Sequence, residues 1–440
     1  MKLKYMNLNP SQLLISVFVT CILIGTLLLK LPIATTETIT WIDSLFTATS
    51  AMTVTGLIVV DTPSAFTLFG EIIIVILIQL GGLGIMTFAV MIYIMLGRRI
   101  GIKGRLVIQQ ALNQTSIGGV VKLVRNLFIF SLTIETIAMI FLAIRWVPVL
   151  GWGKGIYFSL FHAISAFNNA GFALWSDSLM GYVGDPLINI IISLLFIIGG
   201  IGFTVLSDLW YKKKFRKLSL HSRLMLVGTL VLNMVAMFIV FILEYNNPST
   251  LGGLASFTDK VWASYFQATS PRTAGFNTLD IGSLEEPTVF FMLLLMFIGA
   301  GSASTGGGIK LTTFIIIILS VLTFLRGKKE ITISERTINQ TYILRSLAIA
   351  TMGLFFVFIA VFILTIVEDE PVIMVLFEVI SAFGTVGLSM GLTGSLSILG
   401  KIVIICIMFI GKLGPLTLAF SLARSKEERI KYPYEEVLTG

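Results

Sequence analysis

Apolar residues gather along this chain into eight long runs that are separated by shorter polar stretches. The runs lie near 11–31, 70–96, 126–147, 186–210, 223–244, 288–325, 344–367 and 397–422. A helix needs about 20 apolar residues to cross the hydrocarbon core of a bilayer, so the pattern predicts eight transmembrane helices. Their even number places both termini on the same side of the membrane.

A more polar segment lies between the two runs of each successive pair, and it recurs four times. The copies read SLFTATSAMTVTG, SLFHAISAFNNAG, SYFQATSPRTAG and LFEVISAFGTVG, and they end at Gly56, Gly171, Gly275 and Gly387. Each is too short to span a bilayer, which favours a half-length helix followed by extended backbone. Irregular backbone at membrane depth is tolerated only where protein buries it or water lines it. We therefore predict four re-entrant pore segments that meet around a common axis.

The spacing of these segments indicates one structural unit that is repeated. The terminal glycines are 115, 104 and 112 residues apart, and in three copies a Phe precedes the Gly by ten residues and a Ser by six. In the third copy Phe266 and Ser270 are each one residue closer to the Gly. A fixed internal period is the signature of a repeat architecture. We predict an all-α polytopic membrane protein with a pseudo-fourfold pore, built from four helix–pore-helix–helix repeats over 1–97, 98–216, 217–330 and 331–440, the last with a C-terminal tail.

Basic and acidic residues are separated along the chain in a way that predicts its orientation. Of the 31 Lys and Arg residues, 23 fall in five segments, at 2–4, 98–125, 212–223, 326–345 and 424–431. Acidic loops lie between them, so the positive-inside rule places both termini in the cytoplasm. The net charge of +8 therefore reflects membrane topology rather than a nucleic-acid surface. The first run lacks a small-residue cleavage site, so no signal peptide is predicted.

Composition agrees with a membrane protein and narrows the possible chemistry. Hydrophobic residues make up 56% of the chain and charged residues 12%, which excludes an ordinary soluble domain. Two cysteines in apolar runs and two distant histidines predict neither a disulfide framework nor a metal cluster. No HExxH, GxSxG or paired acidic motif appears, so no cofactor is expected and an enzyme is the weakest alternative. A secondary transporter of another class is the other alternative, but its inverted repeats would alternate in topology.

The end of each polar segment is suited to hold a dehydrated cation. A filter needs several oxygens at short range without fixed full charges, and the carbonyls of extended backbone provide them. The preceding half-helix directs the negative end of its dipole at the ion. The first and last segments read TVTG and GTVG, close to the TVGYG type of potassium filter. The predicted potassium-binding residues are Thr53, Val54, Thr55, Gly56, Asn168, Asn169, Ala170, Gly171, Arg272, Thr273, Ala274, Gly275, Gly384, Thr385, Val386 and Gly387.

A second glycine signal follows in the even-numbered apolar runs. It reads LGGLG, IGGIG, IGAGSASTGGGIK and IGKLGP. In the first two copies, close helix packing and a hinge are equally open alternatives. In the third copy ten consecutive small residues have weak helix propensity, so this helix is predicted to break into a loop that lines a cavity and gates the pore. The predicted gate comprises Gly299, Ala300, Gly301, Ser302, Ala303, Ser304, Thr305, Gly306, Gly307, Gly308 and Lys310.

These motifs resemble those of the Trk/Ktr/HKT superfamily of potassium transporters, most closely its Ktr-type membrane subunit. The resemblance covers Pro10 to Gly440 and rests on SAMTVTGL, HAISAFNNAGF, ATSPRTAGFN, SAFGTVGL, GAGSASTGGGIK and IGKLGPLTLAF. It implies selective potassium uptake across the plasma membrane, often linked to sodium. It also implies a homodimer of membrane subunits docked on a cytoplasmic ring of RCK subunits that bind ATP or ADP.

The resemblance extends to single residues. In this family a Gly at the filter position of every repeat is associated with potassium selectivity, whereas Ser in the first repeat favours sodium. The four terminal glycines of this chain match the potassium-selective form. The resemblance also implies that Lys412 belongs to the gate and contacts the glycine-rich loop. Members commonly carry Arg at this position, and Lys keeps the positive charge but lacks the fork of donors.

Several charges within apolar stretches keep two interpretations each. Lys310 and Lys412 either face the gate or extend to the cytoplasmic interface. Glu135 and Glu378 are either hydrogen-bonded structural groups or parts of a proton relay. Arg272 either tethers its pore helix or repels ions directly.

Overall fold

The computed structural model describes residues 10–84, 120–328, 330–333, 335–414 and 435, and their regular secondary structure is almost entirely helical. The predicted span ends at 85–96 and 415–422 therefore lie outside the described residues. The α-helices are α1 (Pro10–Leu29), α2 (Trp41–Thr53), α3 (Thr62–Ala65), α4 (Leu68–Leu83), α7 (Val120–Leu150), α8 (Trp152–Phe167), α9 (Pro186–Ile201), α10 (Phe203–Lys212), α11 (Leu220–Glu244), α12 (Phe257–Thr269), α13 (Glu286–Phe297), α14 (Leu311–Leu325), α15 (Gln340–Val367), α16 (Val372–Gly384) and α17 (Ile398–Leu413). Short 3-10 turns lie at Met180–Tyr182, Phe215–Lys217, Leu251–Gly253, Ile281–Ser283 and Thr393–Ser395, and strands β1 (Thr332–Ile333) and β2 (Arg336–Thr337) pair as a hairpin.

Each of the four polar segments forms a short helix between two longer apolar stretches. These helices are α2, α8, α12 and α16, with 13, 16, 13 and 13 residues. Helix α2 shows how the sequence starts one of them: Thr40 and Asp43 form a reciprocal capping box that satisfies free backbone N–H groups. The short helices are mostly buried, which is why their polar residues face other parts of the protein.

The apolar runs are less regular than eight straight helices. Among the described residues, three helices are long and apolar enough to cross a membrane, at Val124–Leu150, Leu220–Glu244 and Gln340–Val367. The run predicted at 186–210 is bent by 94° between α9 and α10, so it counts as a fourth span only as a bent pair. The run at 288–325 is likewise divided, because α13 ends at Phe297 and α14 begins at Leu311. Hydropathy does not register such breaks, which occur at glycines and other small residues.

The second glycine signal allows helices to end or bend and also to pack closely, which are the two alternatives that the sequence left open. Gly84, Gly202 and Gly414 follow the last residues of α4, α9 and α17 with φ of 82°, 105° and 84°. Because L side chains rarely adopt this region, glycine permits the helix to end or bend there.

Close packing is carried by the glycines three positions earlier. A methyl group on Gly81, Gly199 or Gly411 would overlap the carbonyl oxygen of Met52, Phe167 or Phe383. Each of these carbonyls lies four residues before the terminal Gly of its polar segment. The same helix contact is therefore made in the first, second and fourth units of the chain.

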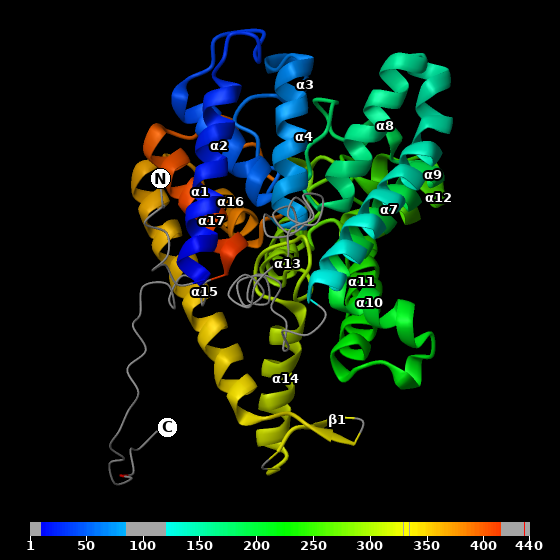
Figure 1. The fold of residues 1–440 in the computed structure, drawn as a ribbon, viewed down its shortest axis with the longest axis vertical. Coiled ribbons are helices and arrows are strands. Elements are labelled where there is room, and N and C mark those ends of the chain that lie inside the picture. The colour runs from blue at the N-terminus through cyan, green and yellow to red at the C-terminus, as the bar shows by residue number, and fades with distance from the viewer. Residues whose placement is uncertain (1–9, 85–119, 329, 334, 415–434, 436–440) are drawn as a thin grey trace.

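The beginning and the end of the described chain lie side by side. In Figure 1, α1 and α2 lie beside α16 and α17, while α7, α8, α9 and α12 form the opposite side, and α14 and α15 extend away towards the β1–β2 hairpin. Lys401 on α17 forms an ion pair with Asp43 on α2, with 2.8 Å between Nζ and Oδ1. The chain thus closes on itself around its short helices.

Candidate functional site

The four predicted filter segments, which are residues 53–56, 168–171, 272–275 and 384–387, share one backbone conformation. In each, the residue two before the terminal Gly has a positive φ, and so has the Gly itself. The values are 52° and 89° for Val54 and Gly56, 57° and 69° for Asn169 and Gly171, 77° and 79° for Thr273 and Gly275, and 51° and 92° for Thr385 and Gly387. Positive φ is a genuine outlier for β-branched residues such as Val and Thr. Repeated strain of this kind is typical of functional sites.

A serine anchors each filter segment to its short helix. The carbonyls of Ser50, Ser165, Ser270 and Ser381 accept the N–H of the residue before each terminal Gly, at 2.8 to 2.9 Å. The hydroxyls of Ser50 and Ser381 also accept the N–H of Gly56 and Gly387 at 3.1 Å. The hydroxyls of Ser165 and Ser270 instead donate to the carbonyls of Phe172 and Phe276. Sequence reasoning noted the spacing of these serines but assigned them no role.

The four terminal glycines face one another around a closed ring. A methyl group on Gly56 would overlap the carbonyl oxygen of Ala170, and one on Gly171 would lie 2.9 Å from Cα of Gly275. A methyl group on Gly275 would overlap the carbonyl oxygen of Val386, and one on Gly387 that of Thr55. Each segment thus touches the next, and the fourth touches the first. All sixteen predicted residues are brought together, with Gly171 and Gly387 half-buried and the others buried.

The non-helical loop between α13 and α14, residues 298–310, lies against two of the filter segments. Methyl groups on Gly306 and Gly307 would overlap the side chains of Thr273 and Thr385. The N–H of Gly307 donates to Oγ1 of Thr385 at 2.8 Å. Glycine is needed at both positions because the backbone passes directly beside the filter side chains.

Asn169 is the residue that joins two filter segments to the 298–310 loop. Its Nδ2 donates to Oγ1 of Thr273 at 3.1 Å, and its Oδ1 accepts from Oγ1 of Thr305 at 2.8 Å. All three side chains are buried, so each bond is shielded from water. The position of the loop and the geometry of the filter segments are therefore coupled through one amide.

Further loop contacts come from α9, α10 and α17. The N–H of Gly301 donates to the carbonyl of Gly200 at 2.7 Å, and that of Phe203 to the carbonyl of Ala303 at 2.8 Å. On α17, the N–H of Gly308 donates to the carbonyl of Gly411 at 3.2 Å. The loop is thereby attached to the same glycine-rich turns that the sequence singled out.

Both predicted gate lysines donate to loop carbonyls. Lys412 Nζ donates to the carbonyl of Thr305, and Lys310 Nζ donates to the carbonyl of Gly306 at 2.6 Å. Lys412 occupies the position that Gly82 and Gly200 hold in the corresponding glycine motifs. Of the two interpretations of these lysines, the structure favours contact with the loop.

Arg272 is tethered to a neighbouring helix. Its Nη1 donates to Oδ1 of Asn233 on α11 at 3.0 Å, and its side chain is buried. This contact supports the tether interpretation.

Glu135 on α7 belongs to a buried polar network that reaches a filter residue. Its carboxylate accepts from Ser131 Oγ at 2.8 Å and from Gln79 Nε2 at 3.1 Å. Asn168 Nδ2 donates to Oε1 of Gln79 at 2.6 Å and to Oε1 of Glu135 at 3.5 Å. The network fixes the side chain of the first residue in the second filter segment.

Glu378 lies in a different environment, although it is also fully buried. Its carboxylate accepts from Ser389 Oγ at 2.7 Å and from Thr393 Oγ1, both of which follow the fourth filter segment. Each carboxylate thus accepts several hydrogen bonds, which favours the structural interpretation over a proton relay.

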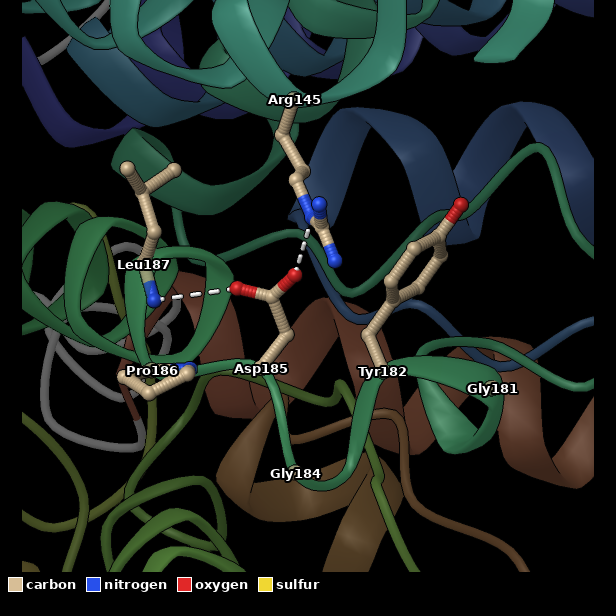
Figure 2. Close-up of a pocket in the computed structure, with 7 residues that line it drawn as sticks. All are labelled: Arg145, Gly181, Tyr182, Gly184, Asp185, Pro186 and Leu187. Carbon is tan, nitrogen blue, oxygen red and sulfur yellow. Dashed lines mark hydrogen bonds and ion pairs between the residues drawn. The ribbon is translucent and has the colours of Figure 1, made fainter.

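A separate pocket lies between α7 and the segment that leads into α9. It has a volume of about 650 Å³ and is lined by Arg145, Gly181, Tyr182, Gly184, Asp185, Pro186 and Leu187 (Figure 2). Asp185 forms an ion pair with Arg145 at 2.5 Å and accepts the N–H of Leu187 at 3.1 Å, which caps α9. None of the predicted site residues line it. Within the described ranges, no group of three His, Cys, Asp or Glu residues could hold a metal ion.

Comparison with known proteins supports the relationship that the motifs indicate. A family model described as TrkH, a cation transport protein, matches residues 5–430. The Ktr system potassium uptake protein B of Bacillus subtilis (strain 168) is 58% identical over 438 residues, which cover 100% of this chain and 98% of that protein. A protein of the same name from Vibrio alginolyticus is 45% identical, covering 98% of this chain and 95% of its own length. The potassium/sodium uptake protein NtpJ of Enterococcus hirae is 37% identical over 99% of this chain and 98% of its own length.

The crystal structure of the potassium transporter TrkH from Vibrio parahaemolyticus has the same fold. It superposes with a TM-score of 0.74 at 19% identity, covering 96% of this chain and 86% of that chain. The resemblance stated from the motifs is thereby confirmed, and it places the protein among multi-pass membrane transporters rather than enzymes. The chain belongs to the TrkH family of cation transport proteins.

Proposed function

We propose that this chain is the ion-translocating membrane subunit of a Ktr-type potassium uptake system. The observation that carries the proposal is the closed ring of four strained segments, each touching the next at its terminal glycine. Four helix–pore-helix–helix repeats, at 1–97, 98–216, 217–330 and 331–440, would each supply one segment to a pseudo-fourfold pore. Relatives over the full length of the chain are named as potassium uptake proteins, which supports the same ion.

The filter segments select potassium through their backbone carbonyls. Carbonyl oxygens replace the hydration shell of a cation without introducing fixed negative charge. The short helices end at the ring, so the partial negative charge of each C-terminus favours a cation there. Positive φ at two positions per segment lets the backbone turn repeatedly within four residues.

The 298–310 loop acts as the gate of this pathway. It contacts filter residues Asn169, Thr273 and Thr385, and it is anchored by Lys412. Irregular backbone at this depth is stable because protein surrounds it. Displacement of the loop would open the pathway below the filter.

The assembly and orientation follow from the family and from the charge pattern. We propose a homodimer in the plasma membrane with both termini in the cytoplasm, docked on an RCK ring that binds ATP or ADP. The basic linkers between repeats are the surfaces available to that ring. Sodium dependence is part of the proposal because one relative is named a potassium/sodium uptake protein.

Complementation of potassium-uptake-deficient cells tests this function. Expression of the chain with an RCK subunit is expected to restore growth at low potassium, because the four filter segments supply a potassium-selective pathway. Growth is compared with and without the RCK subunit, across a series of sodium concentrations. Failure to restore growth by a protein that is shown to be inserted in the membrane would contradict the proposal.

Replacement of Glu135 should alter potassium affinity without abolishing transport. In Glu135→Gln the carboxylate loses an acceptor oxygen, so Gln79 and Asn168 rearrange behind the second filter segment. We expect the KM for potassium uptake to change by about tenfold, since removal of a hydrogen bond to a charged group is worth about 1.5 kcal/mol. Glu378→Gln is the matched control, because its partners lie beyond the filter, and it should leave the KM unchanged. Equal KM values for wild type and Glu135→Gln would contradict a positioning role.

A further inference from the structure

A second, smaller cavity lies where the third filter segment meets α9, α11 and the 298–310 loop. Its volume is about 20 Å³, and its lining includes Gly200, Thr229, Asn233, Thr269, Arg272 and Ala300. A polar cavity needs roughly 10–15 Å³ of probe volume to hold one water molecule. This cavity therefore has room for one small species and excludes polyatomic ions such as phosphate.

Two polar atoms that face this region are buried without a hydrogen-bond partner. They are Nε of Arg272 and Oγ1 of Thr229, in side chains that are 8% and 7% exposed. Arg272 makes one hydrogen bond, from Nη1 to Asn233. Buried polar atoms are nearly always satisfied, so two orphaned donors at one cavity indicate a missing acceptor.

The charge of Arg272 is uncompensated as well. The ion pairs of the described residues are Arg145–Asp185, Lys212–Asp208 and Lys401–Asp43, and Arg272 is in none of them. A buried charge without a counter-charge is costly. This one lies three residues before Gly275, where a fixed positive charge opposes the binding of a cation.

We propose that the cavity is a binding site for one monovalent anion of the size of chloride, held between Nε of Arg272 and Oγ1 of Thr229. The guanidinium N–H and the threonine hydroxyl are both donors, and an anion accepts from both. A water molecule would satisfy these hydrogen bonds, but the positive charge of Arg272 would remain without a counter-charge. The anion neutralises the charge of Arg272 beside the third filter segment. It also contacts the 298–310 loop at Ala300, which lines the cavity.

Bromide diffraction tests the binding site independently of transport. Crystals of the full chain grown in bromide are expected to show an anomalous peak between Arg272 and Thr229. Thr229→Val should remove the peak, because the isosteric side chain lacks the hydroxyl. Thr288→Val is the matched control, since Thr288 is another buried threonine with an orphaned hydroxyl but does not line the cavity, and it should retain the peak. Ordered water or no density at the site in bromide would overturn the proposal.

Potassium uptake in proteoliposomes tests the consequence, and this readout rests on the proposed function. Replacement of chloride by gluconate on both sides should weaken the apparent potassium affinity about tenfold, a typical coupling between two sites. In Thr229→Val the two media should give equal affinities, whereas Thr288→Val should respond as wild type does. Equal affinities of the wild type in both media would overturn the role of the anion. Absence of uptake in both media would contradict the proposed function. The bromide peak would still show whether an anion binds between Arg272 and Thr229.

Discussion

Gly56→Ser is expected to lower the selectivity of uptake for potassium over sodium by about tenfold or more, which corresponds to about 1.4 kcal/mol. Gly56 has a φ of 89°, and a side-chain carbon there overlaps the carbonyl oxygen of Ala170 in the next filter segment. The two segments must therefore move apart, which changes the distances of the carbonyl oxygens from a bound ion. The ratio of potassium to sodium uptake in competition assays measures the effect.

The corresponding variants at the other segments give the prediction an internal order. Gly275→Ser and Gly387→Ser also force a side chain onto a neighbouring carbonyl oxygen, so they should lower selectivity by a similar factor. In Gly171→Ser the added carbon lies farther from its neighbours, so the loss of selectivity should be smaller. Gly391→Ser is the control. Gly391 has a φ of 97° but nothing within 4 Å of the added carbon, so the same strain arises outside the ring. Unchanged selectivity in Gly56→Ser, or an equal loss in Gly391→Ser, would contradict the filter assignment.

Shortening the 298–310 loop is expected to raise potassium flux by about tenfold or more, and to do so without the cytoplasmic partner. Deletion of Ser302, Ala303 and Ser304 removes the half-buried part of the loop and pulls Thr305 away from Asn169. A barrier below the filter is then lost, while the four filter segments keep their own residues. Flux of a potassium tracer into proteoliposomes that contain the purified subunit alone measures the effect.

Two further variants separate the loop's anchor from its length. Lys412→Met removes a hydrogen bond from a charged donor to the carbonyl of Thr305. Such a bond contributes about 1.5–3 kcal/mol, so its loss should shift the balance of closed and open loop by roughly 10- to 100-fold. The double variant Ser302→Ala with Ser304→Ala keeps the loop length and should conduct like wild type. A correctly folded deletion variant with unaltered flux would contradict the gate assignment.

The positions of the short helices and of the main helix break could be read from the sequence. Polar segments of fixed spacing correspond to α2, α8, α12 and α16, and the ten small residues fall within the non-helical loop between α13 and α14. These features are local, because hydropathy, glycine content and helix propensity act over a few consecutive residues. At the bend between α9 and α10 the sequence left close packing and a hinge as open alternatives, since Gly202 interrupts a run whose hydropathy is continuous.

The side-chain connections of the site needed the tertiary structure. Asn169 bonds to Thr305 across 136 positions, and Lys412 reaches the same residue across 107. No periodicity or motif specifies a contact between residues so far apart, because it depends on which surfaces the packed helices bring together. The same holds for the orphaned donors beside Arg272, which become visible only when burial is known.

The sequence by itself determined that this is a polytopic helical membrane protein with four polar segments that end at glycine. Apolar length and glycine spacing suffice for that, since both are set by the bilayer and by backbone sterics. Only the tertiary structure decided that the four glycines face one another in a closed ring, with Lys401 and Asp43 joining its first and last units. That arrangement depends on contacts across 358 positions, which come from the packing of all the helices together.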